Sequence, residues 1–164
     1  MSVYDREVDV IIDEVTLQSK IRALGAEITR DYEGRELTLV GVMKGAVFFL
    51  ADLSRAIDLP LSIELLGVSS CQSVETTGEV RITQDVSTPM RGKHLLLVED
   101  IIDTGLTIQF LLENLKARHP ASVKVCALIE KPSRARGRLA IDYKGFDMDD
   151  RFVVGYGLDY LERY

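Results

Sequence analysis

The segment from residue 95 to residue 115 is the strongest constraint on what this chain can fold into. Residues 95–97 form an apolar run that is typical of a strand buried on both faces of a parallel sheet. Residues 108–115 then carry apolar side chains at i, i+3, i+4 and i+7, the pattern of an amphipathic helix. The polar residues between them lie where a strand ends and a helix begins, and open α/β sheets bind ligands at such junctions.

This junction contains three carboxylates and a Thr-Gly-x-Thr turn. Glu99, Asp100 and Asp103 repel one another, so their clustering lowers stability unless a cation or a ligand compensates. Paired acids suit a Mg²⁺ ion or the hydroxyls of a sugar. The turn at residues 104–107 can direct backbone N–H groups and two hydroxyls at a phosphate. The threonines alone would indicate only helix capping; together with the acids they favour a site for a phosphorylated sugar and a metal.

Alternating strand and helix patterns predict an α/β fold with a mostly parallel central sheet. The expected strands are residues 8–12, 37–42, 61–68, 92–98, 123–129, 141–143 and 151–156, and the expected helices are residues 17–32, 46–57 and 106–119. Residues 69–89 are polar and weakly periodic, so we interpret them as a functional lid or as a hairpin that orders on binding.

The composition fits a soluble chain with a single domain, residues 1–164. Its 26 acidic residues outnumber 20 Lys and Arg, giving a net charge of −6, whereas a nucleic-acid module usually has the opposite balance. The nearest basic cluster joins Lys131 to the arginines at positions 134, 136 and 138, and we interpret it as a solvated loop rather than an RNA site.

The sequence also predicts a cytoplasmic setting without a membrane. No stretch reaches 18 apolar residues, and no secretory signal is visible at the start. Cys71 and Cys126 are far apart and match no metal spacing, which is consistent with a reducing compartment. We expect Cys126, inside an apolar run, to pack as a small hydrophobic residue.

Residues 95–107 resemble the phosphoribosyl-pyrophosphate (PRPP) motif of the type I phosphoribosyltransferases, in which an apolar strand leads to two acids and a Thr-Gly turn. Four other segments resemble the hypoxanthine-guanine branch of that family in order and spacing, over nearly the whole chain: residues 42–46, 77–80, 130–132 and 152–160. The resemblance implies a central mostly parallel sheet flanked by helices. It also implies a mobile loop at about 69–89 and a small hood from N-terminal residues and about 131–164.

The activity implied by the resemblance is purine salvage. A 5-phosphoribosyl group would pass from PRPP to hypoxanthine or guanine, giving IMP or GMP and pyrophosphate, with Mg²⁺ as cofactor. The anomeric carbon acquires oxocarbenium-like charge, so the site must hold a polyanionic leaving group and exclude water.

The family pattern implies a role for each matching residue on the PRPP side. Thr104, Gly105, Leu106 and Thr107 would wrap the 5′-phosphate, and Lys44 and Gly45 would hold pyrophosphate beside a cis Met43–Lys44 peptide. Glu99 and Asp100 would meet the ribose hydroxyls and Mg²⁺. Asp103 would also contact PRPP and would act as the base that accepts the purine N7 proton.

On the purine side the resemblance implies roles for four residues. Lys131 would donate to the 6-oxo group and so exclude adenine, and Phe152 would stack on the ring while the Val153 backbone reads its edge. Asp159 would lie at this end of the site and coordinate a second Mg²⁺. Without the resemblance, Lys131 would read as an exposed loop residue, Phe152 as core and Asp159 as a turn residue.

The chain departs from the family pattern at two places. The family commonly has a Ser-Tyr pair at the start of its mobile loop, where this chain has Ser70-Cys71, so the loop would close over PRPP through different or weaker contacts. Many relatives continue with an Arg and a short tail after the position of Tyr164, the last residue here. Either the sequence is a piece of a longer chain or that pyrophosphate contact is lacking.

Two other functions remain as alternatives. One is a regulator that keeps the PRPP site but binds RNA, which the acidic balance and the motifs at Lys131 and Phe152 disfavour. The other is a transferase for a different base, which fits the C-terminal motifs less well. The sequence leaves open the preference among hypoxanthine, guanine and xanthine, and whether the chain forms the homodimer or homotetramer usual among relatives.

Overall fold

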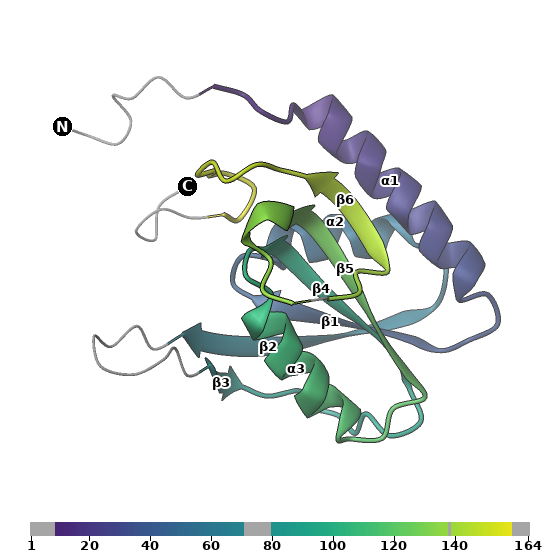
Figure 1. Cartoon of the computed structure of the whole chain (residues 1–164). Coiled ribbons are helices and arrows are strands. Elements are labelled where there is room, and N and C mark those ends of the chain that lie inside the picture. The colour runs from purple at the N-terminus through teal and green to yellow at the C-terminus, as the bar shows by residue number, and fades with distance from the viewer. Residues whose placement is uncertain (1–8, 71–79, 138, 159–164) are drawn as a thin grey trace, which may run out of the picture.

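The computed structural model describes residues 9–70, 80–137 and 139–158, which form a sheet between two layers of helices (Figure 1). The elements follow one another as α1 (Glu14–Asp31), β1 (Leu37–Met43), α2 (Val47–Ala56), β2 (Leu61–Ser70), β3 (Val80–Gln84), β4 (His94–Ile102), α3 (Leu106–Lys116), β5 (Ser122–Glu130), η2 (Pro132–Arg134) and β6 (Tyr143–Asp147). These strands form one sheet in the order β3-β2-β1-β4-β5-β6. β2 and β3 pair antiparallel, and the other neighbours pair parallel.

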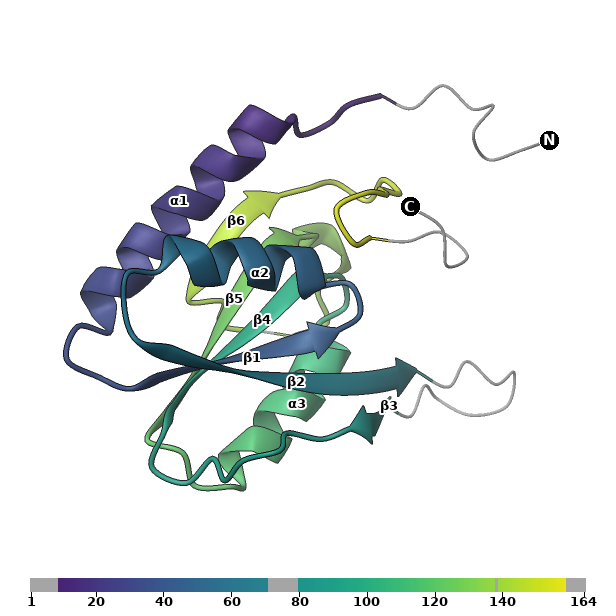
Figure 2. The ribbon, with the colours of Figure 1, turned by 180° about the vertical axis from the view of Figure 1, so that it is seen from behind.

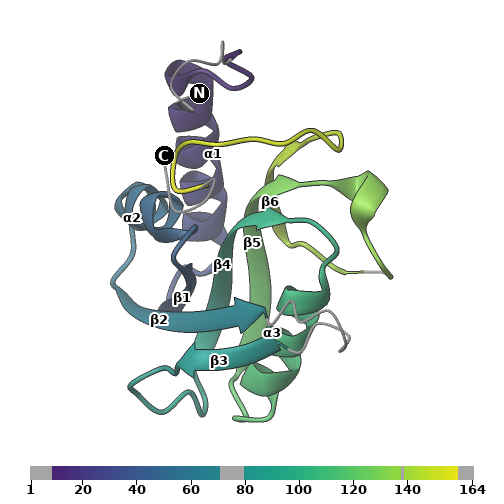
Figure 3. The same ribbon diagram turned by 90° about the vertical axis from the view of Figure 1, so that its left-hand side faces the viewer.

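Helices α1 and α2 cover one face of the sheet, and α3 covers the opposite face (Figures 2 and 3). Successive side chains of a strand point to opposite faces, so β4 contributes to two separate cores. Leu96 and Val98 pack with the α1 and α2 side, whereas Leu95 and Leu97 pack with α3. Burial on both faces explains why this strand reads as an unbroken apolar run.

The capping of α1 follows directly from its sequence. The Asp13 side chain accepts a hydrogen bond from the Thr16 backbone N–H at 2.7 Å, which satisfies one of the free donors of the first turn. Ile21, Leu24 and Ile28 then bury one face of the helix. Within the described residues, no helix is both long enough and apolar enough to cross a membrane.

The strand order creates a crevice at the carboxyl ends of β1 and β4. β1 leads through α2 to β2, while the adjacent β4 leads through α3 to β5 on the other side. Because α2 and α3 lie on opposite faces, the loops that leave these two strands diverge (Figure 3). Ligands in open α/β sheets bind at such a switch point.

The C-terminal segment, residues 148–158, follows β6 and returns toward this crevice. It turns back on itself at a bridge between Gly155 and Leu158. The Tyr156 hydroxyl donates to the Asp52 carboxylate on α2 at 2.5 Å, which ties the segment to that helix. This contact holds residues 152–158 near the ends of the strands.

The predicted fold class is confirmed, and most predicted elements occur where the sequence placed them. The helices at 17–32, 46–57 and 106–119 correspond to α1, α2 and α3, and the strands at 37–42, 61–68, 92–98 and 123–129 correspond to β1, β2, β4 and β5. Cys126 is buried in the core, as expected.

Three predictions at the sheet edges were wrong. Residues 9–12 form no strand, and the side chains of Val10 and Ile11, just before α1, are exposed instead of packed on the sheet. Residues 151–154 are irregular, and Gly155, Tyr156 and Gly157 have positive φ angles that an extended strand excludes. The strand expected at 141–143 is β6, which begins at Tyr143.

The polar segment 69–89 is more regular than predicted. β3 lies within it and pairs with β2, which extends to Ser70. β3 is an edge strand with mostly exposed side chains, and such a strand needs little apolar patterning. Residues 71–79, including Cys71 and most of the segment 77–80, lie outside the described residues.

Candidate active site

A cavity of about 450 Å³ occupies the crevice at the carboxyl ends of β1 and β4. Most of the residues predicted for the site contribute to its wall: Gly45, Glu99, Asp100, Asp103, Thr104, Gly105, Thr107, Lys131, Phe152 and Val153. Lys44 and Leu106 are exposed and do not line it. Asp159 lies outside the described residues.

Two adjacent carboxylates form the deepest polar part of the wall. Glu99 and Asp100 are buried, and both line the cavity. Burial raises the pKa of Glu99 well above its usual range, and the neighbouring Asp100 raises it further through a hydrogen bond and charge repulsion. The Asp100 carboxylate accepts from the Ile101 backbone N–H at 2.7 Å. Burial therefore disfavours the charged form of Glu99, and a cation bound beside it would favour that form.

Glycine at position 45 is required by the approach of this acid. A Cβ atom placed on Gly45 would overlap the Asp100 carboxylate. The turn after β1 and the end of β4 therefore meet at a glycine. A Cβ on Gly157 would likewise overlap the Gly45 carbonyl, so the C-terminal segment closes on the same turn.

The turn after β1 has the backbone conformation that the resemblance implied. The Met43–Lys44 peptide bond is cis. Met43 and Gly45 line the cavity, whereas the Lys44 side chain is exposed. A contact from this turn to a ligand would therefore come first from its backbone.

The turn between β4 and α3 presents the start of a helix to the cavity. Gly105 has a φ of 81°, a left-handed conformation that glycine adopts without strain, and it occupies the N-cap position. A glycine N-cap offers no side-chain acceptor, and no side-chain cap is present on α3. Thr104 Oγ1 accepts from the Leu106 N–H at 3.5 Å, a long contact that contributes little capping. The N–H groups that follow Leu106 in the first helical turn can bind an anion.

Lys131 follows β5 and enters the cavity wall from the other side. It is only 8% exposed, so it is not the solvated loop residue that its sequence alone would indicate. Its backbone N–H donates to the Ile102 carbonyl at 2.9 Å, which joins the end of β5 to the end of β4. Its ammonium lies 3.9 Å from Asp150, too far for a hydrogen bond, so this pair leaves its donors available.

Phe152 lines the cavity without being part of the core. Its side chain is 68% exposed, which excludes the alternative of ordinary core packing. Val153 beside it is partly buried against the core on the α1 and α2 side. An exposed aromatic ring next to a buried Lys can bind a flat heterocycle by stacking while a donor meets the edge of the heterocycle.

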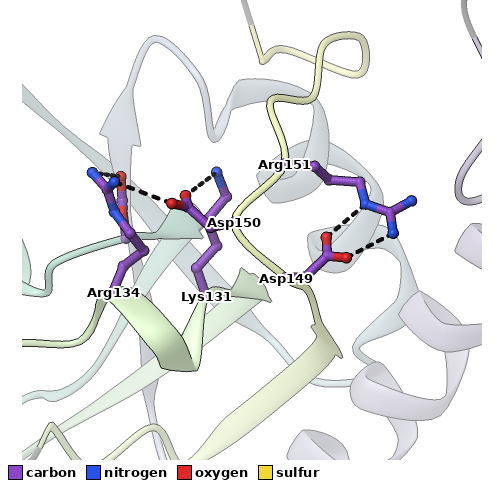
Figure 4. Close-up of polar contacts among 6 residues, drawn as sticks. Lys131, Arg134, Asp149, Asp150 and Arg151 are labelled. Carbon is purple, nitrogen blue, oxygen red and sulfur yellow. Dashed lines mark hydrogen bonds and ion pairs between the residues drawn. The ribbon is translucent and has the colours of Figure 1, made fainter.

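Asp103 forms an ion pair with Arg134, which the sequence analysis interpreted as part of a solvated loop. Arg134 Nε lies 2.9 Å from Asp103 Oδ1, and Arg134 Nη1 lies 3.3 Å from Asp150 Oδ2. Figure 4 shows Asp150 between Arg134 and Lys131. No local signal marked Arg134, because it lies in the short 3₁₀ turn Pro132–Arg134 and its two partners are 31 and 16 positions away in the sequence.

The donor set at the acid pair fits a magnesium ion. Among the described residues, no group of three or more His, Cys, Asp and Glu side chains could hold a metal by itself. Mg²⁺ however usually takes one or two carboxylates and completes its shell with water and substrate phosphates. The buried pair of Glu99 and Asp100 supplies two such oxygen ligands and gains a counter-charge in return.

The chain belongs to the phosphoribosyltransferase family. The model of the phosphoribosyl transferase domain matches residues 11–161, which includes every wall of the cavity. The cavity at the end of the PRPP motif and the fold around it are consistent with that membership.

Named relatives refine this assignment. The chain is 44% identical to the hypoxanthine phosphoribosyltransferase of Haemophilus influenzae over 96% of this chain and 90% of the relative. It is 44% identical to the hypoxanthine-guanine phosphoribosyltransferase of Bacillus subtilis over 94% and 87%. Among solved structures, a hypoxanthine-guanine phosphoribosyltransferase of Bacillus anthracis aligns with a TM-score of 0.89 at 41% identity, covering 96% of this chain and 91% of that one. These similarities indicate the hypoxanthine-guanine branch.

Proposed function

We propose that this protein transfers the 5-phosphoribosyl group of PRPP to hypoxanthine or guanine, releasing pyrophosphate and giving IMP or GMP. The observation that carries this proposal is the composition of one cavity wall. The same space is lined by the buried acids Glu99 and Asp100, by the weakly capped turn at residues 104–107 except for Leu106, and by the buried Lys131. A sugar phosphate and a purine need these three kinds of contact side by side.

The PRPP end of the cavity is formed by the two turns after β1 and β4. The first-turn N–H groups of α3 and the hydroxyls of Thr104 and Thr107 bind the 5′-phosphate. Glu99 and Asp100 hold the ribose hydroxyls and Mg²⁺. When bound, Mg²⁺ neutralises charge on the pyrophosphate leaving group. The backbone at Lys44 and Gly45 directs N–H groups at that leaving group, and Asp159 serves a second Mg²⁺.

The purine end lies between β5 and the C-terminal segment. Lys131 donates to the 6-oxo group, Phe152 stacks on the ring, and the Val153 backbone reads its edge. Adenine carries a donor at position 6, so it would leave a buried cation facing another donor, and such mismatches discriminate strongly. Asp103 accepts the N7 proton as N9 attacks the anomeric carbon.

Two segments complete this proposal. The C-terminal segment forms the hood over the purine, because Tyr156 and Gly157 hold it against α2 and the Gly45 turn. The segment at about 69–89, which includes β3, acts as the loop that covers PRPP and excludes water during the reaction. We also propose that the chain acts as a homodimer or homotetramer, which light scattering on the purified protein would test.

The direct test is a base-dependent assay of pyrophosphate release. The purified protein is incubated with PRPP and Mg²⁺ and with hypoxanthine, guanine, xanthine or adenine in turn. We expect pyrophosphate and the matching nucleotide with hypoxanthine or guanine and none with adenine. Pyrophosphate release that no base stimulates would contradict the proposal. The relatives do not favour the alternative of an RNA-binding regulator, and Arg134 pairs with two acids rather than standing free for phosphates.

A further inference from the structure

We propose that Arg134 is a positioning residue, which fixes the carboxylate of Asp103 in the orientation needed to accept the purine proton. The inference rests on the proposed function, since it assigns a role within that reaction. It is carried by a chain of charged groups from Asp103 through Arg134 and Asp150 to Lys131, part of which Figure 4 shows.

The contact between Arg134 and Asp103 has the geometry of a side-on fork. Arg134 Nε lies 2.9 Å from Oδ1 and Nη2 lies 3.5 Å from Oδ2, so the guanidinium faces both oxygens. An Asp carboxylate otherwise rotates broadly about its last torsion angle. A fork on both oxygens restricts that rotation while leaving further lone pairs on each oxygen. The carboxylate can therefore be held and still accept a proton.

The backbone around Arg134 is tied to the turn on both sides of Asp103. The Lys131 N–H donates to the Ile102 carbonyl at 2.9 Å, and the Arg136 N–H donates to the Thr104 carbonyl at 3.0 Å. Residues 102 and 104 flank Asp103, so these two hydrogen bonds fix the loop that carries Arg134 against the turn that carries Asp103. The backbone therefore holds the ion pair in place, so its formation does not depend on ordering the Arg134 side chain alone.

Asp150 extends the arrangement to the residue proposed to contact the purine oxygen. One of its oxygens lies 3.3 Å from Arg134 Nη1, and the other lies 3.9 Å from Lys131 Nζ. Asp150 thereby offsets the charge of two cations and limits their separation. The acceptor for N7 and the donor to the 6-oxo group are held at a set distance, as one purine ring requires.

Because Asp103 and Arg134 are exposed, an effect of Arg134 on catalysis can be distinguished from an effect on folding stability. The side chains of Asp103 and Arg134 are 43% and 45% exposed, and ion pairs at such sites contribute little to folding. Removing Arg134 should therefore change turnover much more than thermal stability. A purely structural ion pair would leave turnover unchanged.

The chain offers a matched control in the same region. Arg151 pairs with Asp149, with Nε 2.6 Å from Oδ1, and this pair is also exposed (Figure 4). Neither residue lines the cavity. Arg151→Met therefore removes an exposed Arg–Asp pair near the site without touching the Asp103 network.

The experiment measures kcat, the KM values for PRPP and hypoxanthine, and the thermal midpoint for Arg134→Met, Arg134→Lys and Arg151→Met. We expect Arg134→Met to lower kcat by about 10- to 100-fold, because small misplacements of a reacting group are costly. The KM for PRPP should stay within about threefold and the midpoint within about 4 °C. Arg134→Lys should recover only part of the loss, since an ammonium cannot form the fork. Arg151→Met should match the parent.

An active parent with Arg134→Met within twofold of its kcat would overturn the assignment, as would an equal loss in Arg151→Met. A large rise in the KM for PRPP with kcat unchanged would also overturn it, because Arg134 would then bind substrate. An inactive parent would instead overturn the proposed function.

Discussion

Two glutamates in the sheet expose the same small fraction of their surface, yet their carboxyl pKa values shift in opposite directions. Glu99 in the second half of β4 and Glu64 in the middle of β2 are both 8% exposed. Burial and the adjacent Asp100 raise the pKa of Glu99. Hydrogen bonds from Thr88 and Ser87 lower the pKa of Glu64. Burial is the main cause of the shift at Glu99, whereas hydrogen-bond donors outweigh burial at Glu64.

The opposite pKa shifts distinguish a glutamate that the fold itself satisfies, Glu64, from one that belongs to the proposed active site, Glu99. The Glu64 carboxylate accepts from the Ser87 N–H at 2.8 Å and from the Thr88 hydroxyl at 2.6 Å, so the fold itself satisfies it. Among the described residues, no Lys, Arg or His forms an ion pair with Glu99 or Asp100. Such an uncompensated buried pair costs stability, and a cation or ligand would offset that cost. Changes at the site acids should therefore affect activity, and changes at Glu64 should affect stability.

Removal of metal should give the largest effect. The acid pair and the pyrophosphate leaving group both need a divalent cation, so we expect excess EDTA to abolish turnover and added Mg²⁺ to restore it, with Mn²⁺ a partial substitute. The measurement is base-dependent pyrophosphate release before and after chelation. Undiminished turnover in EDTA would show that the pair of Glu99 and Asp100 is not a metal site.

Asp103→Asn should give the next largest effect. The amide keeps the size of the side chain but cannot accept the N7 proton, and general-base assistance is worth about 10²–10⁴-fold, or roughly 3–5 kcal/mol of barrier. We expect kcat to fall within that range, with PRPP affinity nearly preserved and the pH dependence altered. Asp100→Asn serves as the contrast, because it should raise the KM for PRPP as well. Turnover within threefold of the parent would exclude Asp103 as the base.

Lys131→Ala should have a smaller effect that is confined to the purine. A hydrogen bond to a charged donor contributes about 1.5–3 kcal/mol, so the KM for hypoxanthine should rise roughly tens-fold while that for PRPP changes little. Steady-state kinetics with each substrate varied in turn would separate the two constants. An equal rise in both would indicate that Lys131 supports the structure of the loop instead.

The central elements and most of the cavity wall could be predicted from the sequence because periodicity and turn chemistry are local signals. β4 and α3 are apolar with clear periods, and the acids and the Thr-Gly turn between them stand out. The ion pairs of Arg134 could not be predicted, since they join residues 31 and 16 positions apart. β3 and the turn at residues 155–158 were also missed, because exposed edges and positive φ angles leave little apolar pattern.

The smallest expected effect is the loss of folding stability in Glu64→Gln, which changes the glutamate outside the proposed active site. The depressed pKa of Glu64 means that the native state holds the charged form more favourably than the unfolded state does. Its contribution to stability is therefore present above the usual carboxyl range near pH 4.5 and is lost as the pH falls through the lowered value. At pH 7 the variant should lose about 1–2 kcal/mol, or roughly 2–8 °C in Tm.

The pH series and the activity assay together test this prediction. The parent should lose Tm more steeply than Glu64→Gln on going from pH 5 to pH 3, because only the parent has this carboxylate to protonate. Glu113→Gln, on the exposed face of α3, is the control for removal of one negative charge. Glu64 does not line the cavity, so kcat at pH 7 should be unchanged within twofold. Equal acid sensitivity of parent and variant would mean that Ser87 and Thr88 do not stabilise the charged form.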